Sequence, residues 1–189
     1  MPEDGFARLV TLACHDLRTP LATVNGVAKL LVRQGGLSES DARLAGMIDG
    51  AAEEMASLIT LLALAARIAS GRYAPQLREA DTLALASLAD DRVEVAGSGV
   101  TVSTDVESVS EALAGLALAA LRHGGLPAVS WTVTGRTLVL SPLPEAAAAV
   151  VEGSLPRDLR ALVARMVLEA LGGRLEREGE TLRVELAAS

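Results

Sequence analysis

The chain has 189 residues, enough for one ordinary domain or two small ones. Only 2% of its residues are aromatic and its formal net charge is −7, which argues against nucleic acid and anionic membrane surfaces as partners. The single cysteine, Cys14, excludes an internal disulfide, and the longest apolar run, residues 61–66, falls far short of the roughly 20 residues of a spanning helix. We therefore expect a reduced, cytoplasmic protein without a membrane anchor.

Two long helices are predicted at the start of the chain. Between Phe6 and Val32 apolar residues recur at intervals of three and four, which is the period of one helical stripe. Gln34-Gly35-Gly36 ends this helix, because glycine is costly inside a helix. Ser38, with Asp41 three residues later, resembles a capping box and predicts a second helix that ends near Ser70-Gly71. The first stripe comprises Phe6, Leu9, Val10, Ala13, Leu17, Leu21, Val24, Val27, Ala28 and Leu31, and the second Leu44, Met47, Ile48, Ala51, Met55, Leu58, Leu62 and Ala65.

Residues 1–70 are thus expected to form an antiparallel helical hairpin. Two helices alone leave one side of their apolar seam uncovered, so a second hairpin must cover it. The simplest source is a second copy of the chain, which gives a homodimeric four-helix bundle with two-fold symmetry.

A linker is expected over residues 71–77 and a second domain over 78–189. Alternating patterns and turn residues predict an α+β sandwich, with a sheet backed by helices. Its predicted elements are a hairpin of 92–96 and 100–103 around a turn at Gly97-Ser98-Gly99, a helix over 105–123, strands over 128–134 and 137–140, a helix over 160–171, and a closing hairpin of 174–178 and 181–186.

His15 is the main candidate for chemistry. It lies in the middle of the first predicted helix and about 200° around it from Ala13 and from Leu17, so its imidazole should face away from the apolar seam and into solvent. A neutral imidazole nitrogen is a competent nucleophile when an acceptor orients the other ring nitrogen, and Asp16 is the adjacent acceptor.

Thr19 and Pro20 follow about one turn later. The Thr19 hydroxyl can meet a phosphoryl oxygen or a water, and Pro20 lacks the amide hydrogen that would bond to Asp16, so it loosens or kinks the helix beside the imidazole.

The contiguous string His15-Asp16-Leu17-Arg18-Thr19-Pro20-Leu21 resembles the H-box of the dimerisation and phosphoacceptor domain of two-component sensor histidine kinases. The resemblance covers residues 1 to about 70. It implies that His15 is the phosphorylated residue, that Asp16 is its acid/base neighbour, and that Thr19 holds the position used to dephosphorylate a response regulator. Arg18 belongs to the same motif and is included in the candidate site.

The remainder resembles the ATP-binding domain that follows in those kinases, but without its nucleotide ligands. The two asparagines of the family's N-box fall on Gly115 and Ala119, and the lid glycines align with Asp158 and Arg160. Ser141-Pro142-Leu143-Pro144-Glu145 stands where the adenine-reading Asp-x-Gly-x-Gly turn is expected. We therefore expect no nucleotide, cofactor or metal site in this chain.

The resemblance implies a histidine phosphotransferase that relays phosphoryl groups between the aspartates of response-regulator receiver domains, as pseudo-kinase phosphotransferases do. The receiver would supply Mg²⁺. Two alternatives stay open: a divergent sensor kinase core that autophosphorylates His15 with ATP, and a non-catalytic dimeric scaffold that binds response regulators. A phosphatase role through Thr19 is also open.

Three further residues have simple structural interpretations. Cys14 is expected to be a packed thiol, because Cys14 and His15 alone are too few for a metal site. Trp131 on a strand is expected in the core. His123 is expected to cap the last carbonyls of its helix.

Overall fold

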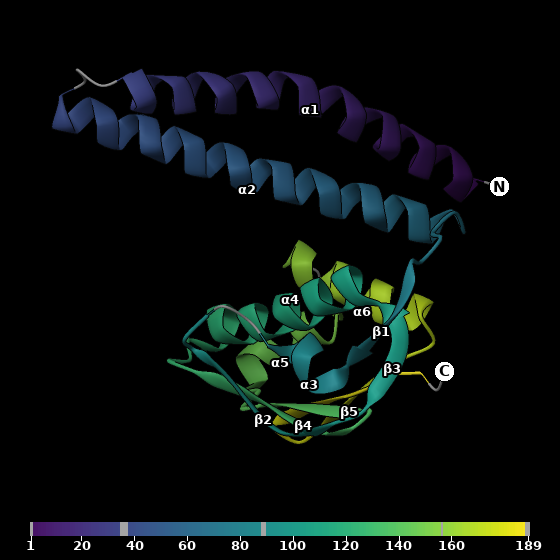
Figure 1. The fold of residues 1–189 in the computed structure, drawn as a ribbon. Helices are drawn as coiled ribbons and strands as arrows, with labels where there is room; N and C mark the ends of the chain where they lie inside the picture. The colour runs from purple at the N-terminus through teal and green to yellow at the C-terminus, as the bar shows by residue number, and fades with distance from the viewer. Residues whose placement is uncertain (1, 35–37, 88–89, 156, 188–189) are drawn as a thin grey trace. The chain divides into compact units, whose positions relative to one another are not determined.

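The computed structural model describes residues 2–34, 38–87, 90–155 and 157–187. It is α+β and divides into two compact units, one up to Tyr73 and the other from Ala74. The first unit is all helical, and the second combines helices with two β-sheets (Figure 1).

The first unit is a hairpin of α1 (Pro2–Gln34) and α2 (Glu39–Ala69), as the sequence predicts. Ser38 caps α2: its hydroxyl oxygen accepts from the Asp41 amide at 3.1 Å, and the hydroxyl donates to the Asp41 carboxylate at 2.7 Å. The Asp41 carboxylate thus bonds to the Ser38 hydroxyl, whereas the longer glutamate of a usual capping box bonds to the backbone amide of the capping residue. The predicted break at Gly35-Gly36 lies outside the described residues.

The seam between the two helices is built mainly from small residues at intervals of seven. On α1 the inward positions are Ala7, Cys14, Leu21 and Ala28, of which Leu21 is half-buried and the others are buried. On α2 they are Ala45, Ala52, Ile59 and Ala66, all buried. Small side chains let two helices approach closely, and a spacing of seven keeps them on one face of each helix. Cys14 is a packed thiol, as predicted.

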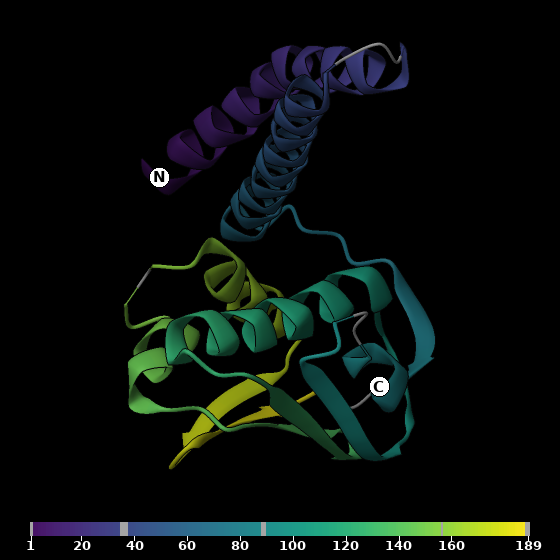
Figure 2. The ribbon, with the colours of Figure 1, turned by 90° about the vertical axis from the view of Figure 1, so that its left-hand side faces the viewer.

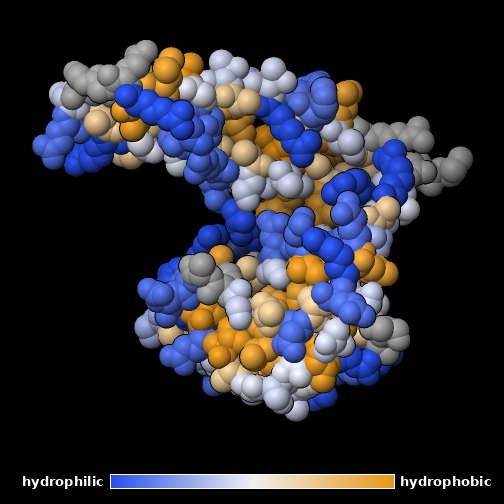
Figure 3. Space-filling view, viewed as in Figure 1, coloured by the Kyte–Doolittle hydropathy of each residue, from blue (hydrophilic) through white to orange (hydrophobic). Residues whose placement is uncertain are grey.

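Most of the larger apolar side chains in the predicted stripes lie outside this seam. Leu17, Val24, Val27 and Leu31 on α1 are exposed, as are Leu44, Met47, Ile48, Met55 and Leu62 on α2. Figure 3 shows hydrophobic side chains at the surface of the hairpin, among strongly hydrophilic ones. The predicted stripes are thus real, but they form an uncovered face rather than the contact between α1 and α2.

The second unit contains a five-stranded sheet in the order β2-β4-β5-β7-β6 and a two-stranded sheet of β1 (Leu77–Asp81) and β3 (Thr101–Asp105). In the larger sheet β2 (Val93–Gly99) runs parallel to β4 (Val129–Gly135). The remaining neighbours, β5 (Thr137–Ser141), β7 (Thr181–Glu185) and β6 (Arg174–Glu178), pair antiparallel. The strands at 128–134 and 137–140 and the closing hairpin are as predicted.

Helices cover one face of the five-stranded sheet (Figure 2). They include α4 (Val106–Gly124), α5 (Glu145–Val151) and α6 (Leu159–Ala170), and a short α3 (Thr82–Ala86) packs near β2. The sheet contributes a fully buried Trp131, as predicted, together with Leu138 and Leu140. The sequence patterns do not predict α3, α5 or β1.

The predicted hairpin of residues 92–103 is wrong. Its two strands belong to different sheets, because β2 joins β4 whereas β3 joins β1. Gly97 and Gly99 lie inside β2 and do not form a turn. At Gly97, where φ is +119°, a Cβ would collide with the backbone of Val133, and at Gly99 it would collide with the Asp81 carboxylate. At both positions a neighbouring segment approaches so closely that only glycine fits. Closely spaced glycines are also typical of tight turns, which is why the sequence pattern predicted a turn here.

Candidate functional site

The candidate site centres on His15, which projects from α1 into solvent. Its side chain is 79% exposed and that of Asp16 is 69% exposed. His15 Nδ1 lies 3.2 Å from Asp16 Oδ1. When Nδ1–H donates to this carboxylate, the lone pair of the neutral ring resides on Nε2, which is then the nucleophilic atom.

Pro20 lies near the middle of α1 without ending it. The helix is continuous from Pro2 to Gln34 and curves along its length (Figure 1). Proline has no amide hydrogen, so the carbonyl of Asp16 has no helical donor at this position. The predicted break in helical hydrogen bonding therefore falls next to the imidazole, whereas the helix itself continues through it.

The other two predicted site residues lie on the same side of α1 as His15. Thr19 is one turn further along and exposed, and its carbonyl accepts from the Thr23 hydroxyl at 3.2 Å. Arg18 is also exposed and, among the residues that the structure describes, it has no ion pair. The structure thus places His15, Asp16, Arg18 and Thr19 together around one turn of helix.

A groove begins at Arg18 and runs between the two helices. Small side chains make up much of its lining, and its volume is about 430 Å³. Around Gly26 the space is open, because a Cβ there would meet no atom within 4 Å. The lining residues are Arg18, Leu21, Ala22, Asn25, Gly26, Ala52, Ala56 and Thr60.

The hairpin therefore has two different sides. Val24 is nine residues after His15, which is two and a half helical turns, so it lies on the opposite side of α1. On α2, Met47 is nine residues before Ala56, which lines the groove, so Met47 also lies on the opposite side of its helix. His15 and the groove thus lie on one side, and Leu17, Val24 and Met47 of the uncovered apolar face lie on the other.

In the second unit, direct helix packing occupies the positions at which the kinase resemblance expects nucleotide ligands. Gly115 and Ala119 are buried in α4, and a Cβ on Gly115 would lie 3.2 Å from the carbonyl oxygen of Arg160 on α6. Asp158 is the N-cap of α6 and bonds to the last turn of α4. At Gly115 the backbones of α4 and α6 are therefore in close contact.

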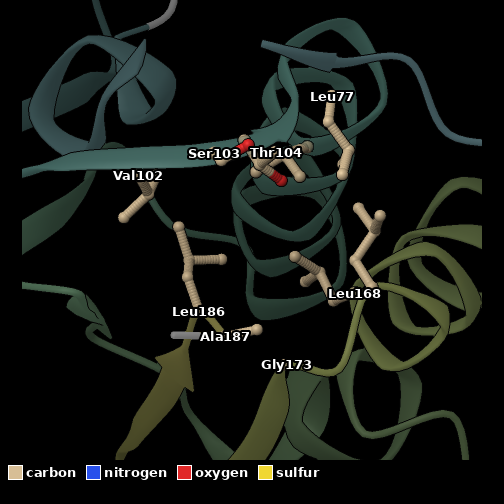
Figure 4. Close-up of a pocket in the computed structure, with 10 residues that line it drawn as sticks. Leu77, Val102, Ser103, Thr104, Leu168, Gly173, Leu186 and Ala187 are labelled. Carbon is tan, nitrogen blue, oxygen red and sulfur yellow. The ribbon is translucent and has the colours of Figure 1, made fainter. Parts of the chain in front are cut away.

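A pocket of about 350 Å³ opens elsewhere in this unit (Figure 4). It lies between β3, the start of α4, the end of α6 and the residues that follow β7. None of the side chains that line it is charged, so it offers no counter-charge for a triphosphate and its metal ion. The lining residues are Leu77, Val102, Ser103, Thr104, Val109, Leu168, Leu171, Gly173, Leu186 and Ala187.

Within the described ranges, no group of three or more His, Cys, Asp or Glu side chains could hold a metal ion. Nor does any helix in the described part of the chain combine the length and apolarity needed to cross a membrane.

Comparison with known proteins supports the same reading of the hairpin. Residues 7–71 match the family model of the His Kinase A (phospho-acceptor) domain. None of the curated proteins matches the sequence.

Solved structures share the fold of both units. Full-length ShkA in complex with AMPPNP aligns over 96% of this chain at 19% identity, with a TM-score of 0.69. This chain spans about half of ShkA, 47% of its length. The histidine kinase AdeS of Acinetobacter baumannii aligns over 93% of this chain and 98% of its own, at 14% identity and a TM-score of 0.57. A bacterial phosphotransferase also matches at 16% identity over 94% of each chain, but its TM-score of 0.39 is too low to call the folds alike.

The hairpin is thus a phosphoacceptor domain of the His Kinase A type. The whole chain, with an N-terminal helical hairpin and a C-terminal mixed-sheet domain, has a fold similar to that of the histidine kinase AdeS and of ShkA.

One polar cluster, formed by Arg122, His123 and Asp158, is not indicated by any local sequence pattern. His123 does not cap the carbonyls at the end of α4, since the amide of Gly125 bonds to Leu121 there. Instead, His123 Nε2 lies 3.1 Å from Asp158 Oδ2. The prediction for His123 was wrong because its partner lies 35 residues away along the chain and no local pattern indicates the pairing. The role of Asp158 as an N-cap could have been predicted, because an aspartate directly before a helical pattern is a typical start signal.

Proposed function

We propose that this protein is a homodimeric histidine phosphotransferase. His15 takes a phosphoryl group from the aspartate of one response-regulator receiver domain and passes it to the aspartate of another. The observation that carries the proposal is the exposed imidazole of His15, oriented by Asp16, on the side of the hairpin opposite its uncovered apolar face.

The uncovered apolar face supports the homodimer. Its exposed side chains include Leu17, Val24 and Val27 on α1 and Met47 and Ile48 on α2. An apolar strip that follows both helices of a hairpin fits a second copy of the same strip, related by a two-fold axis. Association through this side leaves His15 accessible in each protomer.

The transfer itself needs one nucleophile. Nε2 of His15 attacks the phosphorus of an aspartyl phosphate, and the N–P bond forms while the bond from phosphorus to the aspartate oxygen breaks. The aspartate leaves as a carboxylate, and the Asp16 carboxylate stabilises the positive charge that develops on the imidazole. Attack by a second receiver's aspartate on the phosphohistidine reverses these changes. Mg²⁺ held by the receiver would neutralise charge on the phosphoryl oxygens.

The groove beside His15 supports a helical element of the receiver as the docking partner. Ala22, Gly26, Ala52 and Ala56 keep it shallow and apolar, which allows another helix to approach closely. At its His15 end, Arg18, which has no ion pair within the described part of the chain, offers a positive charge to a phosphoryl group or an acidic side chain.

Transfer between receivers needs no nucleotide, and the second unit fits that requirement. Gly115 lies against α6, and the lining of the 350 Å³ pocket carries no charge. We therefore expect no binding of ATP with Mg²⁺ at millimolar nucleotide, measured by calorimetry or thermal shift.

The test is to mix the protein with receiver domains that have been phosphorylated by acetyl phosphate, and to follow acid-labile phosphate on the chain. We expect label on the wild-type protein and none on His15→Ala. His123→Gln is the matched control, because His123 is the chain's other histidine, and it should retain the label. Absence of label with every receiver in the panel, or label on His15→Ala, would contradict the proposal.

The similarity to ShkA, whose structure contains AMPPNP, favours a second candidate, the core of a divergent sensor kinase. It makes the opposite prediction. In the absence of any receiver, label from the γ-phosphate of ATP would appear on His15.

A further inference from the structure

A buried carboxylate joins the two principal helices of the second unit. The Asp158 side chain is 4% exposed. Its Oδ1 accepts from the amides of Arg160 at 3.0 Å and Ala161 at 3.3 Å, which caps the first turn of α6. Its Oδ2 lies 3.2 Å from Arg122 Nη1 and 3.1 Å from His123 Nε2, both on the last turn of α4.

Each oxygen therefore serves a different helix. Oδ1 satisfies amides that have no partner inside α6, and Oδ2 meets cationic or donor side chains at the end of α4. A carboxylate buried in this way is stabilised only while all four partners are in place, because an unpaired buried charge is strongly unfavourable.

Apolar packing holds the first turn of α6 less firmly than the rest of the helix. The fully buried residues of α6 are Ala161, Val163, Ala164, Val167 and Leu168; in the first turn only Ala161 is fully buried, and Leu159 and Leu162 are half-buried. Beside this turn, Gly115 brings the backbones of α4 and α6 into contact, an arrangement that has little side-chain area to bury. The attachment of this turn rests mainly on Asp158.

We propose that Asp158 is a latch: it fixes the first turn of α6 to the last turn of α4, and breaking it frees this turn while the sheet and the rest of α4 stay folded. The latch keeps α4 and α6 in contact without a ligand. It is a separate proposal from the phosphotransfer, because its residues belong to the second unit whereas His15 belongs to the first.

Hydrogen–deuterium exchange of the full chain tests the latch. In Asp158→Ala we expect residues 159–163 to exchange about ten- to a hundredfold faster, the effect of losing an N-cap and a charged hydrogen bond. Asp158→Asn retains a capping oxygen but not the charge, so it should give a smaller acceleration in the same segment. β4 and β5 should exchange as in the wild type.

Two further variants keep the test decisive. His123→Gln perturbs only the α4 side of the latch and should accelerate the same segment, so it serves if Asp158→Ala does not fold. Glu169→Gln is the control, because it removes an exposed ion pair with Arg165 in the same helix at 2.9 Å; it should change little. Unchanged exchange of residues 159–163 in both Asp158→Asn and His123→Gln, or equal acceleration throughout the second unit, would overturn the proposal.

Discussion

Replacing Val27 by aspartate tests whether the apolar face of the hairpin holds two copies together. Val27 is 52% exposed in the single chain. Full burial of a valine side chain contributes roughly 1.5–3 kcal/mol, so covering the exposed half contributes roughly 1 kcal/mol. A two-fold dimer contains the residue twice, so the loss amounts to about 2 kcal/mol, or roughly thirtyfold in the dissociation constant.

The new carboxylates add to this loss, because each must give up hydration in the interface or repel its copy. We therefore expect Val27→Asp to weaken the dimer by at least about a hundredfold. Sedimentation velocity over a range of protein concentrations measures the effect.

Gly46→Asp is the matched control for the added charge. Gly46 is exposed on α2 and has open space around it, and none of the residues three or four positions away from it belongs to the apolar face or lines the groove. It should leave the dissociation constant unchanged. Equal constants for wild type and Val27→Asp, or a wild-type chain that stays monomeric at high micromolar concentration, would refute the assignment of this face.

Three other changes probe the site and the second unit. Gly26→Leu should fill the groove and slow phosphotransfer from a receiver at least about tenfold, which corresponds to a loss of about 1.4 kcal/mol of docking free energy. Gly50→Leu, also in an open helical position, should leave the transfer rate unchanged. Equal transfer rates for wild type and Gly26→Leu would exclude the groove as the docking surface. Thr19→Ala should slow dephosphorylation of a receiver while His15 still accepts label, and unchanged release of inorganic phosphate would exclude a role for the hydroxyl. The Arg177 guanidinium, which hydrogen-bonds the Glu145 carboxylate, holds the pKa of Glu145 below its ordinary value. The stability that this pair contributes is therefore fully present above the ordinary glutamate pKa, and it is lost as the pH falls through the lowered pKa of Glu145. In Arg177→Gln, an NMR titration should find the pKa of Glu145 back in the ordinary range. An unchanged pKa would contradict Arg177 as the cause.

The sequence predicts the hairpin well because its signals are local. The glycine pair, the Ser38 cap and the repeat of apolar residues all act within a few turns, and the H-box string is contiguous. The sequence also indicates correctly that His15 faces away from the apolar stripe. The sequence does not indicate which apolar residues lie between α1 and α2 and which lie on the uncovered face. The small residues of the seam and the larger apolar residues beside them recur with the same helical period, so the pattern cannot separate them.

The errors in the second unit arise from contacts that are distant in sequence. The pairing of β2 with β4 and of β3 with β1 depends on strand order, and the alternating pattern around Gly97 fits a hairpin equally well. The ion pair of His123 with Asp158 likewise depends on how α4 and α6 pack. Strand β1 and helix α5 are short, and each contributes too few periodic residues for a pattern to predict it.

Ala52 belongs both to the seam and to the groove: it is fully buried between α1 and α2, and it lines the surface beside His15. A bulkier residue at position 52 would push α1 and α2 apart and would change the shape of the groove between them. A substitution at Ala52 would therefore change the shape of the groove from inside the hairpin while every exposed side chain stays the same.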